Sequence, residues 1–170
     1  MSEDPAKARI RQEWIEGSTS RIREGLSLLS HNPVSVDWHV FEGPTRPDVF
    51  IETDRYIIVV EGKRAEHSNT TSTKWMQCRH QMLRHIDCAW EIRGQKDVFG
   101  FFIVESADGS KVPEQWNSFA KSTTSEASVK LSLPHRGFEE SLHISRAFIG
   151  VTTWQTVCDE FRDMGLHRSM

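Results

Sequence analysis

The chain has 170 residues, a length that suits one domain with a single hydrophobic core rather than two. Its apolar fraction of 37% and six tryptophans supply bulk for that core, and its net charge of −3 does not by itself indicate a polyanionic partner. No run of about 18 apolar residues predicts a membrane span. The N-terminus lacks the basic-then-apolar order of a secretory signal, and the three cysteines are not closely paired. We therefore expect reduced thiols in a cytoplasmic protein.

Two helices and a strand are predicted ahead of residue 45. Apolar residues at four-residue spacing predict a helix from residue 5 to about Gly17, and a second apolar stripe predicts another over 21–30. Pro33 cannot continue that second helix. Alternating polar and apolar residues over 34–41 predict the first strand, in which His39 is interpreted as an ordinary strand histidine.

A β-hairpin is predicted at the centre of the chain. Val49–Ile51 is a short apolar run, and Tyr56–Val60 is a β-branched and aromatic run of the kind that strands prefer. The polar residues Thr53–Arg55 between them predict the turn. These two strands are expected to pair in antiparallel fashion.

Three ionisable residues stand at the ends of this hairpin, away from its turn. Asp48 precedes the first strand, and Glu61 and Lys63 lie at the end of the second. In an antiparallel pair the start of one strand lies beside the end of the other, so we expect Asp48 next to Glu61. Side chains two residues apart share a face of a strand, so Glu61 and Lys63 should point the same way. A charge directly after an apolar strand is costly unless it has a partner or a function.

This grouping has the chemistry of a divalent-metal site. Mg²⁺ is commonly held by one or two carboxylates, with water and substrate phosphate completing its shell. A neighbouring lysine can orient the water that attacks phosphorus. Pro47-Asp48, a strand–turn–strand, and then Glu61-Gly62-Lys63 is similar to the signature of the PD-(D/E)xK nuclease superfamily, which has the restriction-endonuclease-like fold.

The resemblance covers residues 34–105 and implies roles for several residues. Asp48 and Glu61 would be metal ligands, the backbone carbonyl of Gly62 a further ligand, and Lys63 the catalytic lysine. Members of the superfamily often carry another acidic residue on a helix ahead of the hairpin. Three residues qualify here by type and stay open as alternatives: Glu13, Glu16 and Glu24.

A helix over 74–91 is predicted to follow a polar loop. Gln81 and His85 are four residues apart and therefore share a face of that helix. The pair is similar to the superfamily's glutamine followed four residues later by tyrosine, with His85 in the tyrosine's place. The resemblance implies that Gln81 orients the substrate or the lysine, and Gln77 is the rival glutamine.

Basic residues near the hairpin suggest a phosphate-contacting surface. Such contacts position a nucleic acid without reading its sequence. A solvent-exposed helix face also carries lysine and arginine as a rule, so the alternative is an ordinary exposed face that contacts no phosphate. The cations of this region are Arg46, Lys63, Arg64, Lys74, Arg79 and Arg84, and the four taken as nucleic-acid-binding are Arg46, Arg64, Lys74 and Arg84.

The rest of the chain predicts one further buried strand and several short helices. The apolar run over 98–105 is expected to return parallel to the second hairpin strand after the intervening helix. Short helices are predicted over 113–120 and 124–131, a short strand at 149–151, and a last helix that Thr152 or Thr153 caps.

Together these features predict a single α/β domain over residues 1–170, with a restriction-endonuclease-like mixed sheet of four or five strands and helices on both faces. The expected function is Mg²⁺- or Mn²⁺-dependent hydrolysis of nucleic-acid phosphodiester bonds, with DNA as the preferred substrate over RNA. A role in defence or repair is expected by fold analogy alone. A homodimer, or a partner subunit that supplies specificity, would compensate for the small size of the chain. The alternatives are a catalytically silent nuclease-fold binding or scaffold module and a small-molecule phosphohydrolase.

Overall fold

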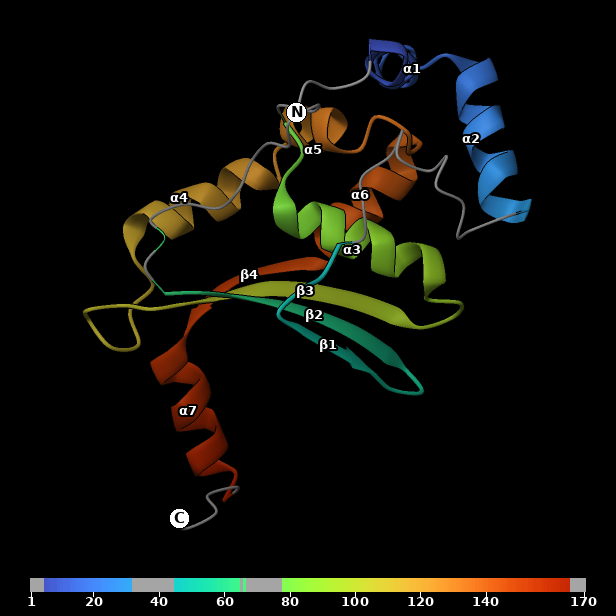
Figure 1. The fold of residues 1–170 in the computed structure, drawn as a ribbon. Helices are drawn as coiled ribbons and strands as arrows, with labels where there is room; N and C mark the ends of the chain where they lie inside the picture. The colour runs from blue at the N-terminus through green and yellow to red at the C-terminus, as the bar shows by residue number, and fades with distance from the viewer. Residues whose placement is uncertain (1–4, 32–44, 65, 67–77, 166–170) are drawn as a thin grey trace.

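The structure is a computed structural model that describes residues 5–31, 45–64, 66 and 78–165 (Figure 1). The strand expected over 34–41, with His39, lies outside the described residues. So do Lys74, Gln77 and most of the predicted polar loop.

Eleven elements make up the described part of the chain. In order they are α1 (Pro5–Ile15), α2 (Thr19–His31), β1 (Val49–Glu52), β2 (Tyr56–Lys63), α3 (Gln81–Ile92), β3 (Asp97–Val104), α4 (Glu114–Thr123), α5 (Glu126–Ser132), α6 (Phe138–Arg146), β4 (Phe148–Thr153) and α7 (Trp154–Asp163). No described helix has the length and apolar character needed to cross a bilayer.

The four described strands form one mixed sheet in the order β1-β2-β3-β4. The hairpin is confirmed: β1 and β2 are antiparallel, with Val49 opposite Val60 and Ile51 opposite Ile58. Strand β3 is parallel to β2 and β4 is parallel to β3, so the expected parallel return after the helix is also confirmed. Parallel strands end at the same edge, so Lys63, Val104 and Thr153 lie together at one end of the sheet.

Helices α3, α4, α5 and α6 lie on one face of the sheet, and α7 lies on the other face at one end (Figure 1). The side chains that alternate along β2 explain why most helices lie on one face of the sheet. Ile57 and Val59 are completely or almost completely buried and face α3, where they join the core with Leu83 and Ile86. That core is the reason why the helical layer sits on this face.

Helix α3 crosses β3 at very close range because of Gly100. A methyl group added at Gly100 would lie 2.7 Å from Ile86 Cδ1 and 2.8 Å from Met82 Sδ. The position therefore admits no side chain without movement of Ile86 and Met82 or of the helix that carries them. Close approach brings the polar face of α3 over the end of β2, where the candidate site lies.

The expected start of the third helix was wrong. The sequence pattern predicted a helix from about residue 74, but residues 78–80 are not helical and α3 begins at Gln81. Contacts with the distant α5 hold this segment extended: the His80 backbone N–H donates to Ser132 Oγ at 3.1 Å. Arg79 donates to the Ser132 carbonyl at 2.5 Å and to Asp87 Oδ2 at 2.8 Å.

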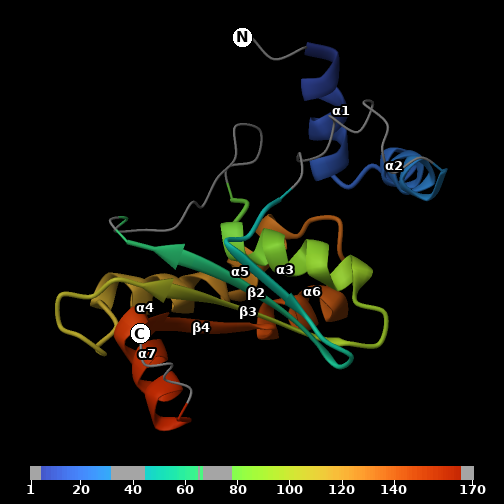
Figure 2. The ribbon, with the colours of Figure 1, turned by 60° about the horizontal axis from the view of Figure 1, so that its bottom comes forward.

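Helices α1 and α2 lie beyond α3, α5 and α6, on the far side of these helices from the sheet (Figures 1 and 2). Gly17 separates them with a φ of 80°, which glycine adopts readily. The Trp14 indole stacks on the His135 ring with centroids 5.2 Å apart. This contact fastens the N-terminal pair of helices to the segment between α5 and α6.

Candidate active site at the end of strand β2

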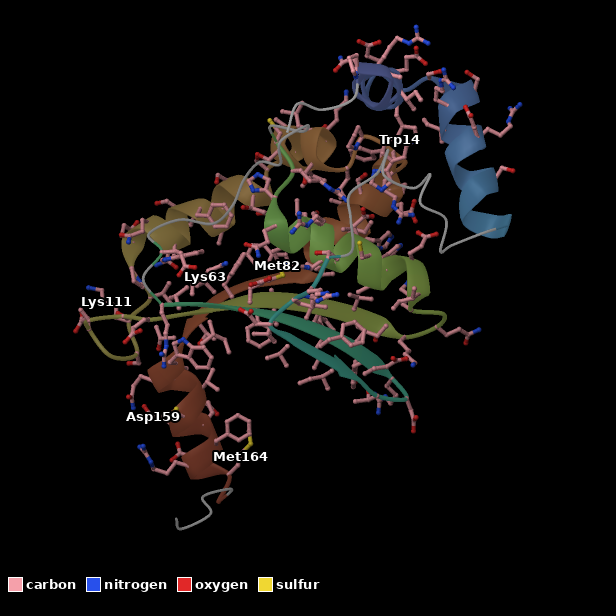
Figure 3. The ribbon with its side chains drawn as sticks, viewed as in Figure 1. Trp14, Lys63, Met82, Lys111, Asp159 and Met164 are labelled. Atoms are coloured by element: carbon pink, nitrogen blue, oxygen red, sulfur yellow. The ribbon has the colours of Figure 1, made fainter. Side chains whose placement is uncertain are left out.

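Asp48, Glu61, Gly62 and Lys63 lie near the edge where β2, β3 and β4 end. Lys63, the last residue of β2, is at this edge, and Figure 3 shows its side chain on the α3 side of the sheet. Loops that leave the carboxyl ends of parallel strands are the usual ligand-binding places of α/β sheets. The hairpin therefore presents its charged end, and not its turn, at a favourable position.

Glu61 is the centre of the group. Its side chain is only 4% exposed, although the residue carries a carboxylate. The Gln81 amide donates to Glu61 Oε1 at 2.8 Å, and His85 Nε2 lies 2.6 Å from the same oxygen. Both partners come from the first turns of α3 and lie on one face of the helix, as their four-residue spacing predicted. Gln81 thus binds the carboxylate, whereas the resemblance implied that it orients substrate or lysine.

His85 connects Glu61 to the segment ahead of the hairpin. Its Nδ1 lies 2.6 Å from Thr45 Oγ1, while its Nε2 contacts Glu61. Close contacts on both ring nitrogens fix the orientation of the ring. The partner of one nitrogen also decides whether the other nitrogen carries a proton. His85 therefore positions the carboxylate. No pattern in the sequence marked Thr45, but the i, i+4 spacing to Gln81 was a usable signal for His85.

Lys63 points toward Glu61, as the two-residue spacing predicted. Its Nζ lies 3.7 Å from Glu61 Oε2 and 4.0 Å from Glu66 Oε1. The Lys63 side chain is 11% exposed, so the ammonium is held in place but reachable from solvent. A partly buried amine beside a carboxylate can orient a polar molecule that enters at this edge.

Asp48 binds the main chain at Gly62, between Glu61 and Lys63. Its Oδ2 accepts a hydrogen bond of 2.8 Å from the backbone N–H of Gly62. Continuing the β1–β2 register from Val49 opposite Val60 places Pro47 opposite Gly62. Proline has no N–H, so it cannot donate to the Gly62 carbonyl in the way that the next residue of a strand would. The hairpin pairing therefore ends here with a carboxylate and a carbonyl oxygen at the same edge.

The donor set fits a hard divalent cation of the Mg²⁺ type. Asp48 and Glu61 offer carboxylate oxygens and Gly62 a carbonyl, which are the ligand classes that Mg²⁺ and Mn²⁺ take. Within the described residues, no three His, Cys, Asp or Glu side chains are grouped to hold a metal ion. A cation held at this edge would therefore have few protein ligands and would take water and phosphate for the rest of its shell.

Trp154, at the start of α7, borders the site from the other face of the sheet. A methyl group added at Gly62 would lie 3.0 Å from Trp154 Cζ2 and 3.5 Å from Asp48 Oδ2. The absence of a side chain at Gly62 thus makes room for the indole, which is 41% exposed. No local pattern around Trp154 indicated a site role, because only the parallel pairing of β4 with β3 brings it here.

The basic residues expected around the site differ in their exposure. Arg46 and Arg64 are exposed near the ends of the hairpin, and Arg84 is half-buried on α3. Arg79, in contrast, is buried and forms an ion pair with Asp87 at 2.8 Å, so it does not face a ligand. Lys74 lies outside the described residues.

The three acidic candidates from the first two helices are engaged elsewhere. Glu13 accepts from Arg21 Nε at 2.6 Å, and this hydrogen bond lowers the pKa of the Glu13 carboxyl. Glu24 also pairs with Arg21, and Glu16 accepts from Gln12. These helices lie beyond the helical layer (Figure 2), so the structure does not bring the three carboxylates to the end of β2.

A cavity of about 640 Å³ lies between the α1–α2 turn and helices α5 and α6. Its lining is largely apolar and includes Leu131, Leu133 and Phe138. None of the residues around Glu61 lines it, so the candidate site is an open edge of the sheet and separate from this cavity.

Comparisons of the chain with protein-family models, with curated proteins and with solved structures gave no match. The assignment of function therefore depends on the geometry around Glu61.

Proposed function

We propose that this chain is a divalent-metal-dependent nuclease of the PD-(D/E)xK type, which hydrolyses phosphodiester bonds of nucleic acids, with DNA as the expected substrate. The observation that carries the proposal is the buried Glu61 carboxylate at the end of a parallel strand, 3.7 Å from the Lys63 amine. Asp48, bound to the Gly62 N–H at the same edge, supports it. The four-stranded mixed sheet is compatible with a restriction-endonuclease-like fold.

Each residue has a defined task under this proposal. Asp48, Glu61 and the Gly62 carbonyl would hold Mg²⁺ or Mn²⁺, which when bound stabilises the negative charge that develops on the phosphate. Lys63 orients the water whose oxygen attacks phosphorus as the bond to the leaving oxygen breaks. Gln81 and His85 hold the Glu61 carboxylate in place. Arg46 and Arg64 contact neighbouring phosphates.

The test uses plasmid, linear duplex and single-stranded DNA and RNA, with Mg²⁺ or Mn²⁺ added to the purified full chain. Two substitutions separate chemistry from folding. Asp48→Asn keeps an oxygen that accepts from the Gly62 N–H but removes the charge, and Lys63→Met keeps most of the side-chain length but removes the amine. We expect each to lower the cleavage rate about 100-fold or more, the scale of a lost positioned acid–base group.

Lys96→Met is the matched control, because Lys96 pairs with Glu52 at the hairpin-turn end of the sheet. It should cleave at the wild-type rate. Titration calorimetry with Mn²⁺ adds a readout independent of turnover, and Asp48→Asn should weaken binding. Cleavage that survives both substitutions would refute the assignment. A chain that neither cleaves nor binds Mn²⁺ would instead be the silent binding module.

A further inference from the structure

Helix α7 is amphipathic, yet none of its residues is buried. Its apolar side chains recur at three- and four-residue spacings and so lie along one side of the helix. Phe161 is 55% exposed and the C-capping Met164 is 66% exposed. A helix of ten residues is only marginally stable on its own in water and depends on packing of its apolar side. The apolar stripe consists of Trp154, Val157, Cys158, Phe161 and Met164.

The sheet face on the same side as α7 is also apolar, and it is exposed along β1. Val49 pairs with Val60 and Ile51 with Ile58, and paired residues share a face. Phe99 and Phe101 of β3 lie opposite Ile58 and Val60 and extend this face. Val49 is 42% exposed and Ile51 is 45% exposed. Of the described elements, only α7 lies on this side of the sheet (Figure 1).

The stripe and the sheet face adjoin each other. Figure 3 shows Met164 on the side of α7 that looks toward the space beneath the sheet, and Asp159 on the side that faces away from it. The apolar stripe of α7 and the apolar sheet face therefore meet at an angle, and the charged side of α7 lies outside this angle. We call this combined surface the α7–sheet face.

The exposed area is large enough for a protein interface. Six side chains on or beside this face are 41–66% exposed, and together they present on the order of 600 Å² of apolar surface. A standard interface buries roughly 800 Å² on each partner, of which somewhat more than half is apolar. The six are Val49, Ile51, Ile149, Trp154, Phe161 and Met164.

We propose that the α7–sheet face pairs with the same face of a second copy of the chain. The chain carries both halves of a complementary pair, a projecting apolar helix and a flat apolar sheet face. A two-fold axis lets the α7 of each copy cover the sheet of the other, so the contact is closed and self-complementary. The polar side of α7 carries Asp159, Glu160 and Asp163 against one arginine, which disfavours a nucleic acid or an anionic lipid surface as the occupant.

The test is the mass of the full chain in solution, measured by light scattering and by sedimentation equilibrium. We expect twice the 19.6 kDa chain mass at micromolar concentration. Phe161→Glu with Met164→Glu should give the single-chain mass, because both charges would be buried unpaired in the contact. Ile92→Glu is the matched control: Ile92 is 67% exposed at the end of α3, on the other side of the sheet, and its substitution should leave the dimer intact.

A second measurement needs no substitution. Cys158 lies on the stripe and Cys88 lies on α3, and both are exposed in the single chain. Pairing should slow alkylation of Cys158 at high protein concentration relative to low concentration, while Cys88 should react equally at both. A wild-type chain of single mass up to about 100 µM, well above the micromolar affinities of weak specific complexes, would overturn the proposal. So would a Phe161→Glu/Met164→Glu protein that stays dimeric. Neither result depends on nuclease activity.

Discussion

At the scale of single residues, Glu61 is a carboxylate that is almost completely removed from solvent, with a side chain that is 4% exposed. A buried carboxylate is tolerated only when its oxygens are satisfied, and here Gln81, His85 and Lys63 surround it. His85 depends on Glu61 in turn, because its side chain is 1% exposed and has no access to water. The carboxylate therefore matters for folding as well as for the proposed chemistry.

Replacing Glu61 with alanine should destabilise the fold, because it removes the acceptor of the Gln81 amide and leaves the buried His85 ring without the carboxylate that its Nε2 contacts. We expect a loss of about 3–5 kcal/mol in the free energy of unfolding, the range for removing one partner of a buried charged pair. Urea denaturation followed by tryptophan fluorescence measures it. Glu66→Ala is the control, since Glu66 is 54% exposed and its loss should change stability by less than about 0.5 kcal/mol. Equal effects of the two substitutions would contradict the central role of Glu61.

The residues at this site were predictable to different degrees. Asp48, Glu61 and Lys63 stand within one hairpin, so local pattern alone placed them. Gln81 and His85 were recognisable as a helical pair, but their partner was not. Trp154 was out of reach, because its place depends on the parallel pairing of β4 with β3.

At the scale of elements, the packing of α3 on β3 controls whether the two halves of the site meet. Gly100 allows this packing, and Ile86 and Met82 fill the space above it with no exposed surface. The helix carries Gln81 and His85, so the distance between the helix and the sheet determines whether these two side chains contact Glu61.

Gly100→Ala should overpack the contact between α3 and the sheet. The added methyl group would overlap Ile86 and Met82, and overpacking of a core by this amount costs about 1–3 kcal/mol. Thermal unfolding by circular dichroism should show the lower stability. Gly137→Ala is the control, because nothing lies within 4 Å of a methyl group there and its φ is −64°. A Gly100→Ala protein as stable as the wild type would show that α3 has room to spare.

The hairpin, the parallel strand and the last helix were predictable because their signals are local. Apolar runs bounded by turn residues mark β1, β2 and β3, and Thr153, whose side chain accepts from the Thr156 N–H, caps α7. The start of α3 was not predictable, since residues with ordinary helix propensity are held extended by Ser132. Tertiary hydrogen bonds overrode the local preference there.

At the scale of the whole molecule, a buried ionic group around Asp87 connects α3 to the C-terminal half of the helical layer. Asp87 contacts Arg79 at 2.8 Å, Arg136 at 2.8 Å and His135 at 3.0 Å. Arg136 continues to Glu140 and Glu91 at the surface. Because Trp14 stacks on His135, the group also reaches α1.

The acid stability of the protein should follow the Asp87 carboxyl. Burial alone raises its pKa, but the hydrogen bond and charge of His135 and the charges of Arg79 and Arg136 outweigh burial, so the net pKa lies well below the usual 3.8. A carboxyl whose pKa is lowered by folding stabilises the fold above its unfolded pKa, and this contribution is lost as pH falls below about 4 toward the folded value.

Asp87→Asn tests this dependence through unfolding curves between pH 7 and pH 2. The variant should be less stable at pH 7, because Arg79 and Arg136 lose their counter-charge, and its stability should fall less steeply below pH 4. Asp108→Asn is the control, since Asp108 is 78% exposed and its pairing with Lys111 is at the surface. Parallel curves for wild type and Asp87→Asn would contradict the assignment.

The hairpin separates its charged end from its turn by the length of a strand. Strand β2 has eight residues, which at about 3.3 Å each place Asp54 roughly 25 Å from Lys63. The turn is exposed and polar, and such loop tips accept inserted sequence readily. A short peptide tag grafted after Asp54 would therefore let the protein be tethered to a solid support with its carboxylates directed away from the anchor and open to long polymers in solution.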